Sequence, residues 1–141
     1  ATIGADGEVT ETPASTTRRV ISPESAATMV DMMTDVVCTG TGKDARLDGI
    51  TVAGKTGTAY KVQDGTYGED GSRAYRASFV GFLPAAAPQV TILVTIDEPD
   101  PTTNDRFGGK AAAPLFATVA TSVIHELAIT PTPGDTGCAA R

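Results

Sequence analysis

Three extended segments follow one another in the middle of the chain, and they constrain its fold more than any other feature. They cover residues 51–62, 74–83 and 89–99, and each is rich in β-branched or small apolar residues. Turn-forming residues separate them, and the connections are short, which favours antiparallel neighbours. The pattern therefore predicts an open antiparallel sheet whose first strand can lie at an edge.

Two helical patterns flank these strands. The first covers residues 22–37, where Ser22 is a good N-cap and Pro23 suits the first helical position. The second covers residues 110–129, and because apolar residues wrap most of the way round it, we expect it to be well buried. The expected fold class is α+β: three antiparallel strands, plus a possible short N-terminal strand, packed by helices. The apolar face of the first helix should comprise Ala26, Met29, Val30, Met33 and Val37.

The two ends of the chain lack such patterns. Residues 1–17 are rich in Gly, Thr, Pro and Ser and are expected to form a loop-rich lead-in, while residues 130–141 are expected to form a flexible tail. Cys38 follows the first helix and Cys138 lies in the tail; two cysteines permit one disulfide, but their number alone leaves the pairing open. The N-terminus resembles the middle of a domain, so we expect a segment of a larger protein.

Composition excludes several classes of function. The net charge is −6 and the pI is about 4.6, which argues against a nucleic-acid surface built on general basicity. No apolar run is long enough to span a bilayer, and the N-terminus has no signal-peptide pattern. A single histidine and the absence of Cys-x-x-Cys leave a zinc site almost without ligands, so no metal and no organic cofactor is expected.

Several short motifs fail on their context. The stretch from Gly40 to Lys43 resembles a phosphate loop, but Asp44 stands where that loop needs Ser or Thr. The same stretch follows a helix, which argues against a dinucleotide fingerprint. The single histidine, His125, lies late in an apolar helix, and no Ser-His-Asp set can be assembled around it. The acidic residues at 97–100 could bind a cation, but a solvated turn is favoured.

The sequence Lys55-Thr56-Gly57-Thr58 is the strongest candidate site. Strand alternation places Thr56 and Thr58 on one side, where two hydroxyls could hold a carboxylate or an amide. Lys55 points the other way and could act on the same ligand only at a sheet edge. Gly57 leaves room for a ligand against the backbone. An unpaired Thr58 N–H at the edge could stabilise an oxyanion.

These residues resemble the third conserved motif of the penicillin-binding proteins and serine β-lactamases. The similarity extends to the stretches RASFVGFLPA, VTILVTIDEP and FGGKAAAPLFATVA, which follow in the expected order, and covers roughly residues 8–125. The whole chain, residues 1–141, is thus similar to the C-terminal segment of the transpeptidase domain of a class B penicillin-binding protein. The resemblance implies a partial transpeptidase-like fold in an enzyme that cross-links peptidoglycan stem peptides.

The resemblance also implies roles for individual residues. Lys55 would support the hydrogen-bond and proton network, Thr56 and Thr58 would bind the carboxylate of a substrate or β-lactam, and the Thr58 N–H would form half of the oxyanion hole. Gly57 would let a peptide-like ligand pair with the strand. The parent enzyme would act at the extracytoplasmic face of a bacterial membrane, anchored by an N-terminal segment absent here.

The motifs that should carry the nucleophile are missing. None of the six serines has Lys three residues later or Asn two residues later: Ser15, Ser22, Ser25, Ser72, Ser78 and Ser122. We therefore expect the chain alone to be inactive, to need the remainder of the transpeptidase domain, and to self-associate through surfaces left uncovered. The alternatives are a non-catalytic module of the same fold that binds cell-wall peptides, and an unrelated α+β domain.

Overall fold

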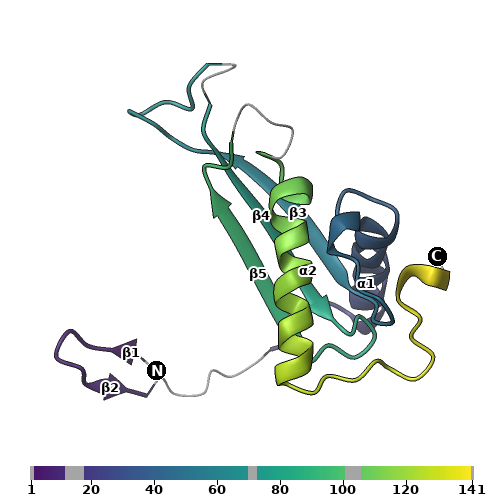
Figure 1. Ribbon diagram of the computed structural model, residues 1–141. Helices are drawn as coiled ribbons and strands as arrows, with labels where there is room; N and C mark the ends of the chain where they lie inside the picture. Colours follow the sequence, from purple (N-terminus) through teal and green to yellow (C-terminus); the bar gives the residue numbers. More distant parts are fainter. Residues whose placement is uncertain (1, 12–17, 70–72, 101–105, 141) are drawn as a thin grey trace.

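The computed structural model describes residues 2–11, 18–69, 73–100 and 106–140 (Figure 1). Its main body is a three-stranded sheet of β3 (Ala53–Tyr60), β4 (Tyr75–Leu83) and β5 (Val90–Asp97). Both pairs are antiparallel, and the order β3-β4-β5 leaves β3 at an edge. The three predicted strands, their direction and their order are confirmed.

Helix α2 (Gly108–Glu126) lies over one face of this sheet (Figure 1). The centre of the contact is a pair of rings, Phe79 from β4 and Phe116 from α2, whose centroids are 4.7 Å apart and whose planes meet edge to face at 63°. Both side chains are completely buried. Around them, apolar residues from β4, β5 and α2, from the end of α1 and from the segment before β3 complete one hydrophobic core.

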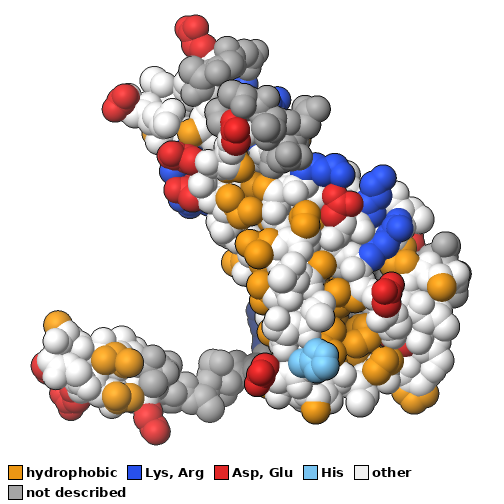
Figure 2. All heavy atoms as spheres, in the orientation of Figure 1, with side chains coloured by type: hydrophobic (Ala, Val, Ile, Leu, Met, Phe, Trp, Pro, Cys, Tyr) orange, Lys and Arg blue, Asp and Glu red, His pale blue; other side chains and the backbone are white. Residues whose placement is uncertain are grey.

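The expectation that this helix is well buried is wrong for one of its sides. Leu115 and Val119 are 44% and 37% exposed, although they continue the apolar pattern of the helix. The sheet lies under one side of α2, so only the residues on that side are buried. Figure 2 shows hydrophobic side chains on the surface in this region.

Helix α1 (Pro23–Cys38) begins as predicted and packs by its last turns beside β3. The Ser22 hydroxyl accepts a hydrogen bond from the Ser25 N–H at 3.1 Å, which satisfies one of the free amides of the first turn. The buried residues of α1 lie only at its C-terminal end. Met29, predicted to lie on the apolar face of this helix, is 54% exposed, because the first half of the helix extends beyond the sheet that the described residues form.

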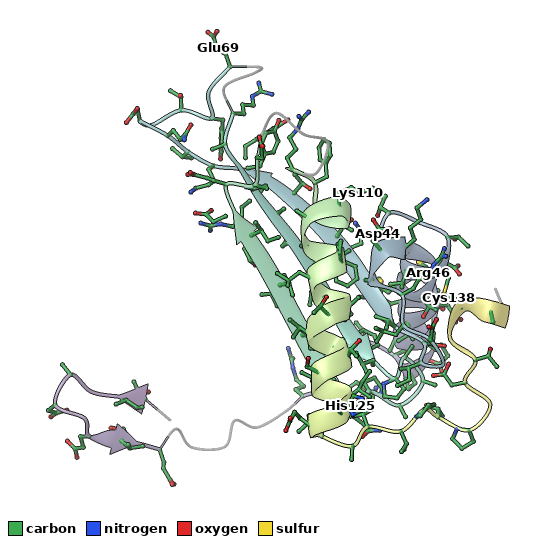
Figure 3. All side chains as sticks on the ribbon, in the orientation of Figure 1. Asp44, Arg46, Glu69, Lys110, His125 and Cys138 are labelled. Atoms are coloured by element: carbon green, nitrogen blue, oxygen red, sulfur yellow. A yellow bond between two sulfur atoms is a disulfide. The ribbon has the colours of Figure 1, made fainter. Side chains whose placement is uncertain are left out.

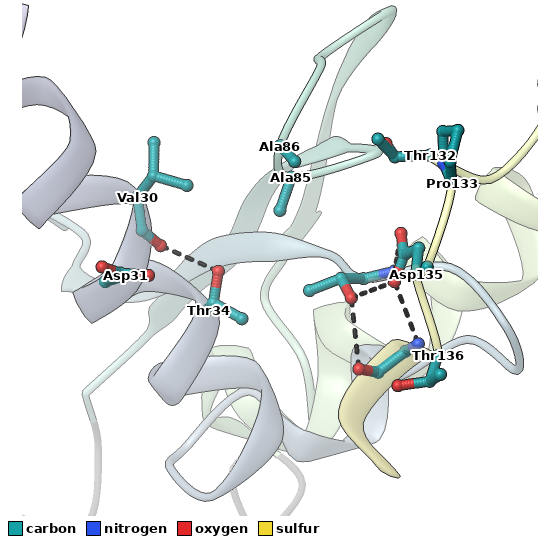
Figure 4. A pocket seen from close by; sticks show the side chains of 12 residues that line it. Val30, Asp31, Thr34, Ala85, Ala86, Thr132, Pro133, Asp135 and Thr136 are labelled. Atoms are coloured by element: carbon teal, nitrogen blue, oxygen red, sulfur yellow. Dashed lines mark hydrogen bonds between the residues drawn. The ribbon is translucent and has the colours of Figure 1, made fainter. Parts of the chain in front are cut away.

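The C-terminal tail is fastened to the body, which corrects the expected flexible segment at 130–141. Cys138 forms a disulfide with Cys38 at the end of α1, and the two Cα atoms are 5.2 Å apart. Cys138 belongs to the short helix η3 (Gly137–Ala140). The side chain of Asp135 binds the backbone next to β3 (Figure 4). These long-range contacts hold residues that have no periodic pattern of their own.

The lead-in contains more structure than one strand. β1 (Thr2–Ile3) and β2 (Val9–Thr10) form an antiparallel hairpin with its own two-stranded sheet, so the expected N-terminal strand does not join the main sheet. Residues 12–17 of the predicted lead-in lie outside the described part of the chain. Neither α1 nor α2 is long and apolar enough to cross a membrane, and the same holds for the other described helices.

Candidate functional site

The edge of β3 presents every second backbone group away from the sheet. The Lys61 N–H donates to the Ala74 carbonyl at 2.9 Å. The backbone N–H and C=O groups of the odd-numbered residues of this strand therefore point toward β4. Alternation then places the N–H groups of Thr56 and Thr58 at the opposite edge. Among the described strands, only β4 pairs with β3. The Thr58 N–H therefore lies on the edge of β3 that no described strand covers.

A pocket of about 590 Å³ lies on the side of β3 that carries the two threonines. Both Thr56 and Thr58 line it, as the alternation of side chains predicts. Its other walls come from the loop that follows α1 and from the first turn of α2, and comprise Gly40, Thr41, Lys43, Asp44, Phe107, Gly108, Gly109 and Lys110.

Each of the two threonine hydroxyls has a defined neighbour within the protein. Thr56 Oγ1 lies 3.1 Å from Thr41 Oγ1, and either oxygen could be the donor. Thr58 Oγ1 accepts a hydrogen bond from the Gly108 N–H at 3.1 Å. That amide belongs to the first turn of α2, where backbone N–H groups have no partner inside the helix.

The Lys55 ammonium reaches round the edge of the strand toward Thr56. Its Nζ donates to the Thr56 carbonyl at 3.0 Å and lies 3.4 Å from Thr56 Oγ1. The side chain of Lys55 is exposed, and it starts from the face of the sheet opposite the pocket. The ammonium of Lys55 thus lies beside Thr56 at the rim of the strand, and its action on a shared ligand stays a prediction.

Gly57 has a packing reason in addition to the predicted room for a ligand. It is paired with Ser78 of β4, and a Cβ added to Gly57 would lie 2.5 Å from Ser78 Oγ. By alternation this contact is on the face opposite the pocket. A larger residue at Gly57 would force the serine hydroxyl to rotate.

The electrostatics of the pocket favour a negatively charged group. Lys43 and Lys110 line it, and the N-terminus of α2 adds the partial positive charge of the helix dipole. Lys110 is also held by Asp44 at 2.8 Å, and Figure 3 shows these two side chains pointing toward one another. Figure 2 shows Lys and Arg side chains gathered beside this end of α2.

The acidic turn after β5 forms ion pairs. Lys61 Nζ lies 2.7 Å from Asp97 and 2.6 Å from Glu98, and Arg76 lies 3.1 Å from Asp97. The hydrogen bond that Lys61 donates to Asp97, followed by the one that it donates to Glu98, raises the pKa of Lys61, and the same bond from Lys61 lowers the pKa of Asp97. No group of three potential metal ligands occurs among the described residues.

Two other features lie away from the threonines. His125 is at the C-terminal end of α2, opposite the end that carries Lys110 (Figure 3). A second hollow, of about 350 Å³, lies between α1 and the tail (Figure 4). There, the Asp135 carboxylate accepts hydrogen bonds from Thr51 and from the Gly137 N–H. The hollow thus lies at the packing interface between the C-terminal tail and the rest of the described fold.

Sequence reasoning missed Thr41, Gly108 and Lys110. The signal for the last two is the sequence Phe-Gly-Gly-Lys at the start of a helix, since two glycines there indicate a close approach of backbones. A Cβ on Gly109 would overlap the Thr41 carbonyl oxygen, which shows how closely α2 approaches the loop. No sequence signal marks Thr41, because its proximity to Thr56 arises only in the folded chain.

Comparison with known families decides the relationship. Residues 1–121 match the family described as the penicillin binding protein transpeptidase domain. The chain belongs to this family. The resemblance found in the sequence is thereby confirmed, and the partial transpeptidase fold is confirmed by solved relatives.

Three relatives show how much of a longer protein the chain covers. Stage V sporulation protein D of Bacillus subtilis is 39% identical over 81% of this chain and 17% of its own length. The probable peptidoglycan D,D-transpeptidase PenA of Neisseria flavescens is 38% identical over 82% of the chain and 28% of its own length. Penicillin-binding protein PbpB of Mycolicibacterium smegmatis is 38% identical over 94% of the chain and 22% of its own length. The chain therefore spans between 17% and 28% of the length of these relatives.

Two solved structures are similar to this chain in fold. The transpeptidase domain of penicillin-binding protein 3 from Burkholderia pseudomallei is similar with a TM-score of 0.67 and 33% identity, over 82% of this chain and 34% of that one. A putative peptidoglycan glycosyltransferase from Atopobium parvulum gives a TM-score of 0.68 and 35% identity, over 79% of this chain and 25% of that one.

Proposed function

We propose that this chain forms one wall of the active site of a peptidoglycan D,D-transpeptidase. The observation that carries the proposal is the edge of β3, where Thr56 and Thr58 line a pocket beside the N-terminus of α2 and Lys55 reaches Thr56 from the rim. Membership of the family supports it, as do relatives that are named peptidoglycan D,D-transpeptidases.

The proposed reaction is acyl transfer through a serine supplied by another part of the full-length protein. The serine oxygen attacks the carbonyl of the D-Ala-D-Ala bond, terminal D-Ala leaves with a proton, and an acyl-enzyme remains. An amine from a second stem peptide then attacks the ester and releases the serine. A β-lactam would acylate the same serine by opening its ring.

Each residue of the edge has a role in this proposal. The Thr58 N–H donates to the oxyanion of the tetrahedral intermediate, where a positioned donor lowers the barrier most. Thr56 and Thr58 hydroxyls hold the terminal carboxylate, and the Lys55 ammonium contributes positive charge and a proton donor. Gly57 keeps the strand narrow, so that the substrate can lie along it as an added strand.

The proposal also covers what the chain lacks. The chain has no Ser-x-x-Lys and no Ser-x-Asn motif, so it should be inactive without the remainder of the transpeptidase domain. Val80 and Leu93 are 37% and 67% exposed, and alternation places them on the sheet face opposite α2. We expect the remainder of the domain to cover this face. The isolated chain should then self-associate through the same face. A monomer mass measured by light scattering at high concentration would contradict this self-association. The full-length protein would act outside the cytoplasmic membrane, held by an anchor.

The test is the acylation rate of the full-length protein by a fluorescent penicillin. Lys55→Ala should lower this rate by about 100-fold or more, the loss usual for a charged group that stabilises the transition state. Lys61→Ala is the matched control, because Lys61 follows the same strand but pairs with Asp97 and Glu98. Unchanged acylation of Lys55→Ala would refute the role of Lys55, and stoichiometric labelling of the 141-residue chain alone would refute its inactivity.

A further inference from the structure

The hydroxyl of Thr56 has two possible donors beside it. Thr41 Oγ1 lies at 3.1 Å and Lys55 Nζ at 3.4 Å. A threonine hydroxyl offers one proton and can accept two hydrogen bonds, whereas a lysine ammonium only donates. Lys55 therefore occupies one acceptor position of Thr56 Oγ1, and the direction of the Thr41–Thr56 hydrogen bond decides where the Thr56 proton points.

An anionic ligand in the pocket fixes that direction. A carboxylate only accepts hydrogen bonds, so Thr56 must give it its single proton. The proton is then no longer available to Thr41, and the hydrogen bond between the two hydroxyls must run from Thr41 to Thr56. The result is a chain of donors from Thr41 through Thr56 to the ligand, in which each hydrogen bond polarises the next.

The direction of the Thr58 hydroxyl proton is fixed in a similar way, by a backbone group. The Gly108 N–H donates to Thr58 Oγ1, and an amide N–H cannot accept in return. The proton of Thr58 is therefore also left for the pocket. Both hydroxyls thus become donors toward the same ligand, and charge-assisted hydrogen bonds to a carboxylate are stronger than those to a neutral group.

The position of Thr41 is closely defined by its surroundings. The first turn of α2 packs on its backbone, where a side chain at Gly109 would overlap the Thr41 carbonyl oxygen. On either side of it, the N–H groups of Gly40 and Gly42 donate to the last carbonyls of α1 at 2.9 Å. A residue held in this way can orient the hydroxyl beside it.

We propose that Thr41 is a positioning residue that directs the Thr56 proton toward the carboxylate of the ligand and so makes the site selective for anions. The proposal rests on the proposed function, because it acts through the contact between Thr56 and that carboxylate. Thr41 is itself exposed, so its hydroxyl contributes little to folding, and its effect should appear in ligand selectivity.

The test compares two β-lactams on the full-length protein, benzylpenicillin and its methyl ester, which differ only in the negative charge. The quantity measured is the ratio of their second-order acylation rates. Thr41→Val should lower the ratio by about three- to tenfold by slowing benzylpenicillin alone, the loss expected for one hydrogen bond between neutral groups, since Thr41 contacts Thr56 and not the carboxylate. Thr41→Ser should restore the ratio. Thr121→Val is the control, since that exposed hydroxyl donates to the Ala117 carbonyl of its own helix and does not line the pocket.

The outcomes separate this inference from the proposed function. If Thr56→Val lowers the ratio and Thr41→Val does not, the positioning role of Thr41 is wrong and the carboxylate contact stands. If Thr56→Val leaves the ratio unchanged, the carboxylate contact itself is wrong and the role of Thr41 falls with it. Equal slowing of both β-lactams by Thr41→Val indicates a structural role and also overturns the inference. Should Thr41→Val fail to fold, Thr41→Ala provides the same comparison.

Discussion

The Asp135 carboxylate accepts hydrogen bonds from the amide and the hydroxyl of Thr51, a residue 84 positions earlier in the chain. The amide lies 3.1 Å from one carboxylate oxygen and 3.0 Å from the other. Thr51 precedes β3, the strand that carries the candidate site. The C-terminal tail is thereby fastened to the start of that strand.

Removing the carboxylate should loosen the tail locally. Asp135→Ala leaves the Thr51 N–H without its acceptor, which costs about 1–3 kcal/mol for a group removed from water. Hydrogen exchange at the Thr51 and Gly137 amides should accelerate by about tenfold or more. Asp48→Ala, which removes an exposed carboxylate from the preceding turn, is the control. Equal exchange in the Asp135 variant and the native protein would show that the contact contributes nothing.

The same contact should depend on pH in a defined direction. Burial alone would raise the pKa of Asp135, but hydrogen bonds from the Thr51 hydroxyl and from the Thr51 and Gly137 amides outweigh it and hold the pKa below its ordinary value. A carboxyl with a lowered pKa in the folded state stabilises the fold above its unfolded pKa of about 3.9. That stabilisation is lost as the pH falls through the lower, folded pKa.

The measurement for this second prediction is the thermal midpoint of the native protein and of Asp135→Asn across a pH series. The difference between the two should be largest near neutral pH. It should shrink below the ordinary range of an aspartate and vanish in strong acid, where the native carboxyl is protonated as well. A difference that stays constant down to strong acid would mean that the charge of Asp135 is irrelevant.

The elements of the fold were predictable because their signals are local. Alternation and short connections identified β3, β4 and β5, and Ser22 with Pro23 identified the start of α1. The exposure of Met29 and Leu115 was not predictable. An apolar pattern shows which side of a helix is apolar, but it does not show which part of that side packs against another element. The anchoring of the tail depends on single long-range contacts, which periodicity cannot reveal.

The candidate site divides in the same way. The shared side of Thr56 and Thr58 follows from the two-residue period of a strand, and the structure shows both in one pocket. Thr41 and Gly108 come from other elements, and only the packing of α2 and the loop after α1 brings them to those hydroxyls. Such contacts between distant segments carry no pattern in the sequence.

The disulfide should contribute measurably to stability. Cys38 and Cys138 are separated by 100 positions, and a crosslink over a loop of that length is expected to stabilise the chain by about 2–4 kcal/mol. Adding a reductant should therefore lower the midpoint of urea unfolding of the native chain. The double variant Cys38→Ser/Cys138→Ser should show the lower midpoint from the outset and no response to the reductant. A reductant effect of equal size on both chains would indicate a cause other than the disulfide.

The contact between Phe79 and Phe116 should be the largest single contribution to the core. Both rings are fully buried and meet edge to face, so Phe116→Ala removes apolar contacts and leaves a cavity. The free energy of unfolding should fall by about 3–5 kcal/mol. Leu115→Ala, one position earlier on α2, is the matched control, because its side chain is 44% exposed and its truncation should cost less than about 1 kcal/mol. Chemical denaturation of both variants measures the difference, and a loss at Phe116 no larger than that at Leu115 would mean that α2 does not bury the face described above.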